Sequence, residues 1–470
     1  MNKIFLFILF SSLLFGCKKQ SYKIDKSKLE INDFVWKGLN SYYLWKPEIS
    51  NLKDSKFTSQ EELNNYLQNF NDPKDLFESL LYQRNVVDRW SWIVDDYVAL
   101  ERLFKGVRKS TGLRIGLVYE PGSSHDVFAF VKYVVPNSDA ANKGLRRGYI
   151  FRKINGTRIN DTNYSELLNN DILDIELAQW QGNNLVDTGN IIHLEKRELA
   201  ENPIYNHQIL QQNGKKIGYL MYNNFFSNYN NQLNSVFADF KNQNIDELIL
   251  DLRYNSGGSV RTMEYLASMI TGQFTGKELL QYQWYPQLQN WMKENYPASL
   301  KRYFTNNMGG IAINHLNLSR VYIIATQSSA SASETLINCL EPYIDVIHIG
   351  TETHGKYTAS ITLYDSPDFQ RYNANPDHKW ALQPIVLKVA NAQGTTDFIN
   401  GLSPDIYLHE DYKNMGILGD VTEPLLNRAL QTIQGITRPS KANHQFLDLK
   451  FKAYPLQNDM QADDVKLLKN

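Results

Sequence analysis

VYIIATQSSASASETLINCLEPYIDVIHIGTETHGK, residues 321–356, contains an apolar run, a polar loop, a helical pattern and a second apolar run. Val321–Thr326 and Val346–Gly350 are short and apolar, as buried strands are, and Ala332–Leu340 lies between them. A strand, a helix and a strand in this order predict a βαβ unit with parallel strands and a right-handed crossover. The stretch therefore predicts an α/β core.

The same alternation continues upstream of this stretch. Ile217–Tyr222 and Glu247–Arg253 have the character of strands, and residues 233–240 and 260–270 place apolar side chains at helical spacing. Strands that alternate with helices predict a parallel sheet covered by helices. We therefore expect one α/β domain over roughly residues 201–410.

The rest of the chain differs in pattern, and 470 residues are too many for one core. Residues 29–103 are helical and aromatic, which indicates a small helical domain rather than an aromatic binding platform. From Thr111 the spacing changes to that of short strands. Residues 272–320 form a long aromatic insertion, either a lid or a packing element, and residues 436–470 are predicted to be a peripheral tail.

Composition excludes several classes of protein. The chain is 42% hydrophobic, and its 49 Lys and Arg residues nearly balance its 50 Asp and Glu residues. A balanced charge lacks the basic excess of a typical nucleic-acid-binding protein. Two cysteines cannot form a disulfide scaffold or a cysteine-type zinc site, and no His-Glu-x-x-His motif occurs. We expect no metal, no cofactor and no nucleic-acid partner.

The N-terminal sequence MNKIFLFILFSSLLFGC indicates export. One lysine precedes an apolar run that is too short to span a bilayer, as in a secretory signal. Leu14-Phe15-Gly16-Cys17 resembles the bacterial lipoprotein box, in which the cysteine is lipidated, and the alternative is a cleaved signal with an incidental cysteine. We expect residues 1–17 to be a lipoprotein signal peptide, and Cys339 to be a buried apolar side chain.

Two polar loops follow predicted strands, where ligands bind in open α/β sheets. The first is Asp251–Gly258 and the second is Thr326–Glu334. In the second loop, Ser331 and Glu334 have the spacing of a helix-capping box, which is the reading that the loop alone favours. Alternatively, Ser331 is a nucleophile at a helix N-terminus, where N–H groups stabilise an oxyanion.

Lys356 changes the balance between these two interpretations. A serine nucleophile needs a base, and a lysine can act as one if burial lowers its pKa far enough to leave it neutral. His354 and His348 are alternative bases, because the chain order of a Ser-His-Asp triad varies between folds. The strand position of His348 gives it no evident path to Ser331, so the lysine is preferred.

The Ser-Ala-Ser-Ala-Ser-Glu string, the Thr-x-x-Gly-Lys-like segment at Thr353–Lys356 and the Asp-Leu-Arg-x-Asn-x-Gly-Gly loop together resemble the C-terminal processing peptidases, also called tail-specific proteases. The resemblance covers roughly residues 111–408 and includes a closing Gly-x-x-Pro-Asp segment at Gly401–Asp405. It implies an α/β, multi-domain fold with a ClpP/crotonase-like βαβ peptidase core. It also implies that Ser331 is the nucleophile and that Lys356, 25 residues later as in the family, is the general base.

The same resemblance implies the supporting residues. Gly257 or Gly258, with the Ala332 N–H, would form the oxyanion hole. Many members have a glutamine four residues after the lysine as a third catalytic group, but this position holds Ser360. Ser360 or Thr358 could orient Lys356, or the site is a plain dyad. Thr353 matches a frequent family threonine, and Glu334 is expected to bind the loop rather than carry a proton.

The segment from Gly112 to Gly156 resembles a PDZ domain. The loop Gly112, Leu113, Arg114 and Ile115 corresponds to the PDZ loop whose N–H groups capture a peptide carboxylate, and the adjoining sheet edge accepts the peptide as a strand. The later Gly148-Tyr149 departs from the Gly-Asp of that family. We therefore expect a PDZ-like domain over residues 106–200.

These predictions combine into a cell-envelope serine endopeptidase, lipid-anchored in the periplasm or at the outer membrane, that cleaves polypeptides near their C-termini. Its domains would be a signal (1–17), a helical domain (18–105), the PDZ-like domain (106–200), the peptidase core (201–410) and a C-terminal tail (411–470). Two alternatives stay open: an inactive peptide-binding scaffold lipoprotein, and a hydrolase of small molecules. The sequence does not indicate the natural substrate or the oligomeric state.

Overall fold

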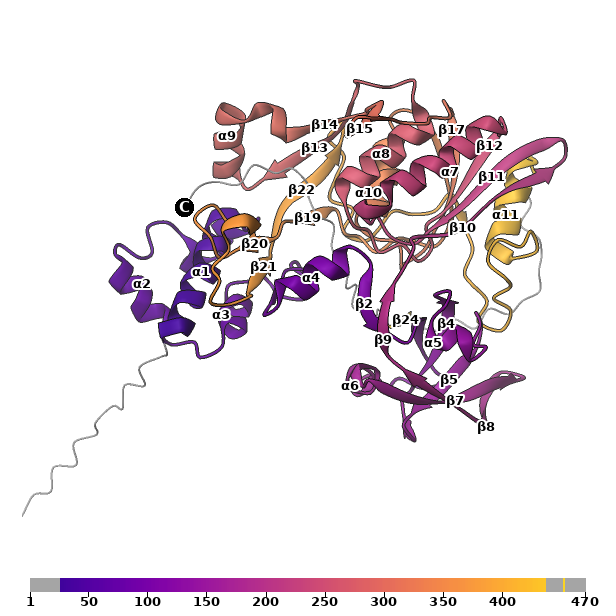
Figure 1. Cartoon of the computed structure of the whole chain (residues 1–470), viewed down its shortest axis with the longest axis horizontal. Helices are drawn as coiled ribbons and strands as arrows, with labels where there is room; N and C mark the ends of the chain where they lie inside the picture. Colours follow the sequence, from indigo (N-terminus) through magenta and orange to yellow (C-terminus); the bar gives the residue numbers. More distant parts are fainter. Residues whose placement is uncertain (1–25, 437–450, 453–470) are drawn as a thin grey trace, which may run out of the picture.

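The computed structural model describes residues 26–436 and 451–452 (Figure 1). The predicted signal peptide and Cys17 lie outside the described residues. Within the described ranges, no helix has the length and apolar character needed to cross a bilayer.

A six-stranded sheet forms the centre of the molecule, in the order β10-β11-β12-β17-β18-β23. All neighbouring strands from β11 to β23 are parallel, and only β10 pairs antiparallel, at one edge. This confirms the predicted α/β core and its strands. Their bounds are β10 Ile204–Gln212, β11 Lys215–Tyr222, β12 Glu247–Asp251, β17 Arg320–Ala325, β18 Asp345–Gly350 and β23 Ile406–Tyr407.

Helices cover both faces of this sheet. Side chains alternate between faces along each strand, so Leu220 shares a hydrophobic cluster with residues of α7 (Asn230–Asn242), α8 (Val260–Thr271) and α10 (Ala332–Leu340). Figure 1 shows these three helices together beside the sheet. Tyr219 and Met221 point to the other face and pack against α11. Helix α11 (Pro424–Ile433) places four side chains in this second core, namely Leu425, Leu426, Ala429 and Leu430. The prediction of a tail from residue 411 is therefore wrong for this segment, which belongs to the core.

The N-terminal region is helical, as predicted, and shares its core with the α/β domain. It consists of α1 (Lys26–Tyr42), α2 (Gln60–Leu67), α3 (Pro73–Ser79), β1 (Trp92–Val94) and α4 (Tyr97–Phe104). One hydrophobic cluster contains Val35 and Phe77 from this region and Leu387 from the α/β part. Strand β1 also joins a sheet with β21 (Ala381–Gln383) and β20 (Leu363–Tyr364).

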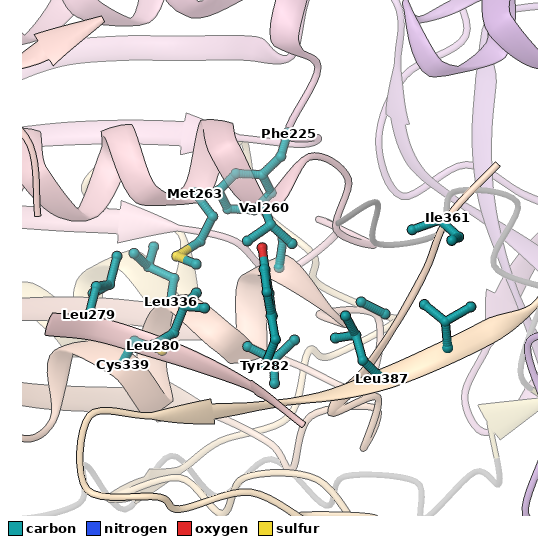
Figure 2. Packing of buried hydrophobic residues seen from close by; sticks show 14 of the residues in the cluster. Phe225, Val260, Met263, Leu279, Leu280, Tyr282, Leu336, Cys339, Ile361 and Leu387 are labelled. Atoms are coloured by element: carbon teal, nitrogen blue, oxygen red, sulfur yellow. The ribbon is translucent and has the colours of Figure 1, made fainter. Parts of the chain in front are cut away.

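The aromatic insertion is a packing element rather than a free lid. Strands β13 (Glu278–Trp284) and β14 (Lys301–Tyr303) form a sheet with β22 (Ile385–Asn391) and β19 (Thr358–Ser360), in the order β14-β13-β22-β19. Figure 2 shows Leu279 and Leu280 of β13 close to Met263 and Leu336. The insertion also contains α9 (Pro286–Asn295), β15 (Asn307–Met308) and β16 (Ile311–Ala312).

The region predicted to be PDZ-like folds around a separate sheet, in the order β24-β3-β4-β5-β7-β8, with its own hydrophobic cluster. Strand β24 (Phe451–Lys452), from far along the chain, pairs antiparallel with the edge strand β3, Phe451 opposite Val118 and Lys452 opposite Leu117. The region's other elements are β2 (Val107–Ser110), β3 (Leu113–Tyr119), β4 (Val127–Val134), α5 (Asp139–Asn142), β5 (Ile150–Ile154), β6 (Thr157–Arg158), α6 (Tyr164–Asn169), β7 (Ile172–Gln181), β8 (Asn184–Glu195) and β9 (Arg197–Ala200).

Candidate active site

The two polar loops predicted from the sequence lie side by side. Strands β12 and β17 are parallel neighbours, with Asp251 opposite Ile324, so the loops leave the same edge of the sheet. Asn255 joins them, because its carbonyl oxygen accepts hydrogen bonds from the Ala330 N–H (3.0 Å) and the Ser333 hydroxyl (2.9 Å). The sheet therefore brings both loops into one buried site, as expected at carboxyl strand ends.

Ser331 is fully buried at the position that precedes helix α10. Its backbone has φ 63° and ψ −115°, a conformation that favours glycine and that strains a residue with a Cβ. Within the described part of the chain, its Oγ has no hydrogen-bond partner, and this includes Lys356. A buried hydroxyl without a partner is uncommon, because burial normally requires compensation, and among the described residues Tyr222 Oη and Thr358 Oγ1 share this property. What distinguishes Ser331 is that its hydroxyl lies at a helix N-terminus.

Glu334 connects the serine loop to the lysine loop. One carboxylate oxygen accepts the N–H groups of Ser331 (2.7 Å) and Lys356 (2.8 Å). The other accepts the Thr353 hydroxyl (2.5 Å) and the Gly355 N–H (2.6 Å). Burial raises the pKa of Glu334, and these four donors oppose the rise. The side chain thus acts as a clamp between the two loops, which is a wider role than the binding of one loop expected from the sequence.

Lys356 is 1% exposed and precedes strand β19. Thr353 holds the preceding turn, since its hydroxyl donates to Glu334 and also accepts the Leu402 N–H at 2.7 Å. Ser360 and Thr358 are both fully buried on β19. The Thr358 hydroxyl has no hydrogen-bond partner among the described residues, so it does not orient the lysine. Ser360 stays a candidate for that role.

The N–H groups near Ser331 differ in their availability. The Gly257 N–H donates to Asn255 Oδ1 at 2.9 Å, whereas neither Gly258 nor Ala332 donates its N–H to another group in the described ranges. Gly257 lies so close to the serine that a Cβ there would be 2.7 Å from the Ser331 Cβ. Its φ of 111° also favours glycine. Gly258 and Ala332 are consequently the better pair of oxyanion donors, and Gly257 provides close approach.

The histidines do not form a base for Ser331. His348 Nε2 bonds the Ala325 carbonyl oxygen at 3.2 Å, and no contact with Ser331 is present among the described residues. Burial, with the positive charges of Arg89 and Lys356, lowers the pKa of His354 to about 4. His354 instead packs against the Trp90 ring, with centroids 6.3 Å apart. This arrangement favours the lysine over either histidine.

The charged residues of the first loop form a scaffold, whereas its glycines lie next to Ser331. Arg253 is completely buried, and its guanidinium bonds Asp251 (2.8 Å) and Glu423 (2.9 Å). Arg147, from the region of residues 106–200, pairs with Glu410 at 2.6 Å, and Glu410 also accepts from Tyr254 at 2.5 Å. Ion pairs of this kind fix the loop and join three parts of the chain.

The residues predicted to bind a peptide carboxylate are already engaged. The Gly112 N–H donates to Ser110 Oγ (3.0 Å), and the Leu113 N–H donates to Thr111 Oγ1 (3.3 Å). Arg114 forms a buried ion pair with Glu201, and Ile115 contributes to the region's hydrophobic cluster. Carboxylate capture there would have to displace the two hydroxyl bonds, while the edge of β3 already carries a strand.

No metal centre is evident at the site. Among the described residues, no group of three or more His, Cys, Asp or Glu side chains is arranged to hold a metal ion. Cys339 is buried in the hydrophobic core, and burial raises the pKa of its thiol.

Comparisons with known proteins identify the family. Peptidase family S41 matches residues 216–408, and the peptidase S41 N-terminal domain matches residues 30–92. A carboxyl-terminal-processing protease from Picosynechococcus sp. is 26% identical over 188 residues, which is 39% of this chain and only 39% of that relative's length. The similarity to that relative therefore covers a minor part of both proteins.

Solved structures extend the similarity along the chain. A proposed S41 protease from Bacteroides fragilis NCTC 9343 is 28% identical, with a TM-score of 0.64 over 86% of this chain and 98% of that one. The photosystem II D1 C-terminal processing protease shares the fold, with a TM-score of 0.52, 19% identity, and 86% and 99% of the two chains covered. The architecture is thus that of a multidomain α/β protein with the S41 protease fold. The chain belongs to peptidase family S41, which confirms the resemblance found in its motifs.

Proposed function

We propose that this chain is a serine endopeptidase with a Ser331–Lys356 dyad. The observation that carries the proposal is the buried Ser331 Oγ, which has no partner among the described residues and lies next to available N–H groups at a helix N-terminus. Glu334 joins its loop to that of Lys356. A buried nucleophile, a nearby amine and oxyanion donors are the parts that acyl transfer requires.

In the proposed reaction, Ser331 Oγ attacks the peptide carbonyl carbon while the neutral Lys356 amine takes the hydroxyl proton. The N–H groups of Gly258 and Ala332 stabilise the oxyanion. The protonated lysine then gives its proton to the leaving amine, and the C–N bond breaks to leave an acyl-enzyme. Water attacks this ester, with Lys356 again as base, and Ser331 is released. Since no hydrogen bond joins Ser331 and Lys356 here, their side chains must move closer when substrate binds, as is common in unliganded sites.

The test is direct. Ser331→Ala and Lys356→Met should each abolish cleavage of an unfolded polypeptide while the circular dichroism spectrum is retained. A fluorophosphonate probe should label Ser331 in the unsubstituted chain. Absence of labelling with intact structure would overturn the peptidase proposal and favour the peptide-binding scaffold.

We further propose that the region of residues 106–200 is PDZ-like and binds polypeptide substrates along the edge of β3. Strand β24 supports this, because it pairs antiparallel there and its C-terminal end runs toward Leu113 and Gly112. A PDZ ligand adds to a sheet edge in the same manner. The apolar side chains of Leu113 and Ile115 share a cluster with Tyr164 and Leu167 of α6, which supplies the second wall of such a groove.

Removal of residues 437–470 should strengthen peptide binding at this edge. A strand of the same chain competes for this edge as an intramolecular ligand. Fluorescence polarisation with a labelled peptide, in Ser331→Ala chains that cannot cleave it, measures the change. Lys452→Pro, which removes a pairing N–H, should act in the same direction, and Asp464→Pro serves as the control. Equal affinity in all chains would show that peptides bind elsewhere.

The location in the cell envelope also remains a proposal. A lipid anchor at Cys17 would hold the chain at the periplasmic face of a membrane, with residues 18–27 as a tether. Metabolic labelling with a fatty acid should be lost in Cys17→Ser, and labelling that persists would contradict the proposed anchor.

A further inference from the structure

The turn that leads into β1 is rigid and attached to the α/β domain. Asp88 is completely buried, and its carboxylate accepts the N–H groups of Trp90 (3.1 Å) and Ser91 (2.9 Å) and the Tyr43 hydroxyl (2.7 Å). Ser91 Oγ in turn accepts the Ile385 N–H at 2.9 Å. The N-terminal region therefore presents Trp90 in a fixed position.

Trp90 forms an apolar wall beside the candidate base. The Lys356 Nζ lies 5.8 Å from the centroid of the indole ring, and the His354 ring lies 6.3 Å away. Trp90 is 8% exposed and belongs to a small cluster with Leu44 and Ile385. The indole thus covers the lysine from the side of the N-terminal region.

Arg89 secures this wall. Its guanidinium stacks on the Trp90 ring at 4.3 Å from the centroid, and Nη2 points to the carbonyl oxygens of Gly355 and Ile399, each at 3.4 Å. Cation–π attraction acts within about 6 Å of a ring centroid. Arg89, at 4.3 Å, therefore interacts strongly with the indole, whereas Lys356, at 5.8 Å, interacts only weakly. The indole therefore acts on Lys356 mainly by excluding water and by restricting the movement of the lysine side chain.

We propose that Trp90, held by Arg89, is a positioning residue for Lys356, supplied to the active site by the N-terminal region. This inference rests on the proposed function of Lys356 as the base. Charged or titratable groups packed around the lysine segment include Arg89, His354 and Glu334, and a pKa of about 4 leaves His354 uncharged at neutral pH. Consequently the N-terminal region contributes to catalysis as well as to folding.

The variants to compare are Trp90→Leu, Trp90→Phe and Trp36→Leu in the full chain. Trp36 lies in the same region but packs on Phe57 and bonds the Asn51 carbonyl oxygen, away from the site. Trp90→Leu should lower kcat for cleavage of an unfolded polypeptide by at least about tenfold, because a misplaced catalytic group costs rate. KM should change by less than about twofold, because the contacts that bind the substrate are unchanged. Trp90→Phe should recover most of kcat, because it keeps an aromatic ring at this position.

The pH profile separates positioning from general stability. Water admitted by Trp90→Leu changes the surroundings of the amine, so the pH profile of kcat/KM should change, whereas Trp36→Leu should leave it in place. Identical kcat and pH profiles for Trp90→Leu and Trp36→Leu would overturn the proposal and leave Trp90 as a core residue.

A measurement without catalysis keeps this result distinct from failure of the proposed function. Trace acetylation with acetic anhydride, read by mass spectrometry in Ser331→Ala chains, reports how accessible the Lys356 amine is. Labelling of Lys356 should be several-fold faster with Trp90→Leu than with unsubstituted Trp90, and unchanged with Trp36→Leu. Equal rates would contradict the shielding role even in a chain without peptidase activity.

Discussion

The two loops after β12 and β17 are similar in sequence character but differ in how their polar atoms are used. In the first loop, the buried Arg253 guanidinium is fully engaged by Asp251 and Glu423. In the second, Glu334 has four donors, yet the neighbouring Ser331 Oγ has none among the described residues. In a buried polar loop, the atom left without a partner is therefore the better indicator of chemistry than the number of charges.

The largest expected effect comes from breaking the scaffold loop with Arg253→Met. Loss of the guanidinium leaves Asp251 and Glu423 buried without their shared partner, which typically costs about 3–5 kcal/mol. The urea midpoint of unfolding should fall sharply.

Arg320→Met is the matched control, because its ion pair with Asp345 is exposed, with side-chain exposures of 46% and 68%. An exposed pair contributes about 0–1 kcal/mol. Similar midpoints for the two variants would show that the buried network does not stabilise the first loop.

Acid should weaken the same network. Burial alone would raise the pKa of Glu410, but Arg147 and Arg253, with hydrogen bonds from Arg147 and Tyr254, lower it to about 2. A carboxyl whose pKa is lowered on folding stabilises the fold above its unfolded pKa of about 4.3, and this contribution disappears as the pH falls toward 2. The free energy of unfolding should thus drop by about 2 kcal/mol between these pH values.

Urea unfolding at several pH values measures this loss, with Glu410→Gln as the comparison. The variant should be less stable at neutral pH and should lose less stability on acidification. If both chains lost stability equally with acid, groups other than Glu410 would be responsible.

The clamp between the loops gives the next effect, through Glu334→Gln. A glutamine has only one acceptor oxygen, so two of the four donors lose their partner at a cost of about 1–3 kcal/mol each before relaxation. The rate of fluorophosphonate labelling of Ser331 and kcat should fall by about 10–100-fold while KM changes little, because the loops lose alignment.

Glu341→Gln, at the exposed end of the same helix, should leave both rates unchanged. Labelling at the full rate in Glu334→Gln would mean that the backbone holds the loops without the carboxylate.

The sequence predicted the strands and helices of the α/β core closely, because their apolar periodicity is local. It also placed Ser331 and Glu334 as either a cap or a catalytic element, and the structure shows why these alternatives could not be separated. Glu334 does bind the Ser331 N–H, as a cap does, but its other donors come from Thr353, Gly355 and Lys356. That contact depends on the neighbouring strand order, which local spacing does not contain.

Other features were missed for the same reason. Trp90 has the sequence context of an ordinary core aromatic, and only the tertiary fold places it beside Lys356. Helix α11 was expected within the C-terminal tail of residues 411–470, although Glu423 at its start binds Arg253, which lies 170 positions earlier in the chain. In the loop that contains Gly112, the N–H groups of Gly112 and Leu113 each donate to the hydroxyl of the residue two positions earlier in the chain. This pattern is local, but the glycine motif by itself does not indicate it.

The smallest expected effect tests whether the second loop stores backbone strain for its chemistry. Ser331 has φ 63°, so Ser331→Gly relieves a strain on the order of 1–3 kcal/mol, partly offset by the flexibility of glycine in the unfolded chain. Both Ser331→Gly and Ser331→Ala should be inactive, but thermal unfolding should show Ser331→Gly to be more stable by about 1 kcal/mol. At Ser333, inside the helix, the same comparison should have the opposite sign, since glycine costs about 1 kcal/mol relative to alanine there. Equal signs at the two positions would mean that the conformation of Ser331 carries no strain, and that the serine is held in place by its neighbours alone.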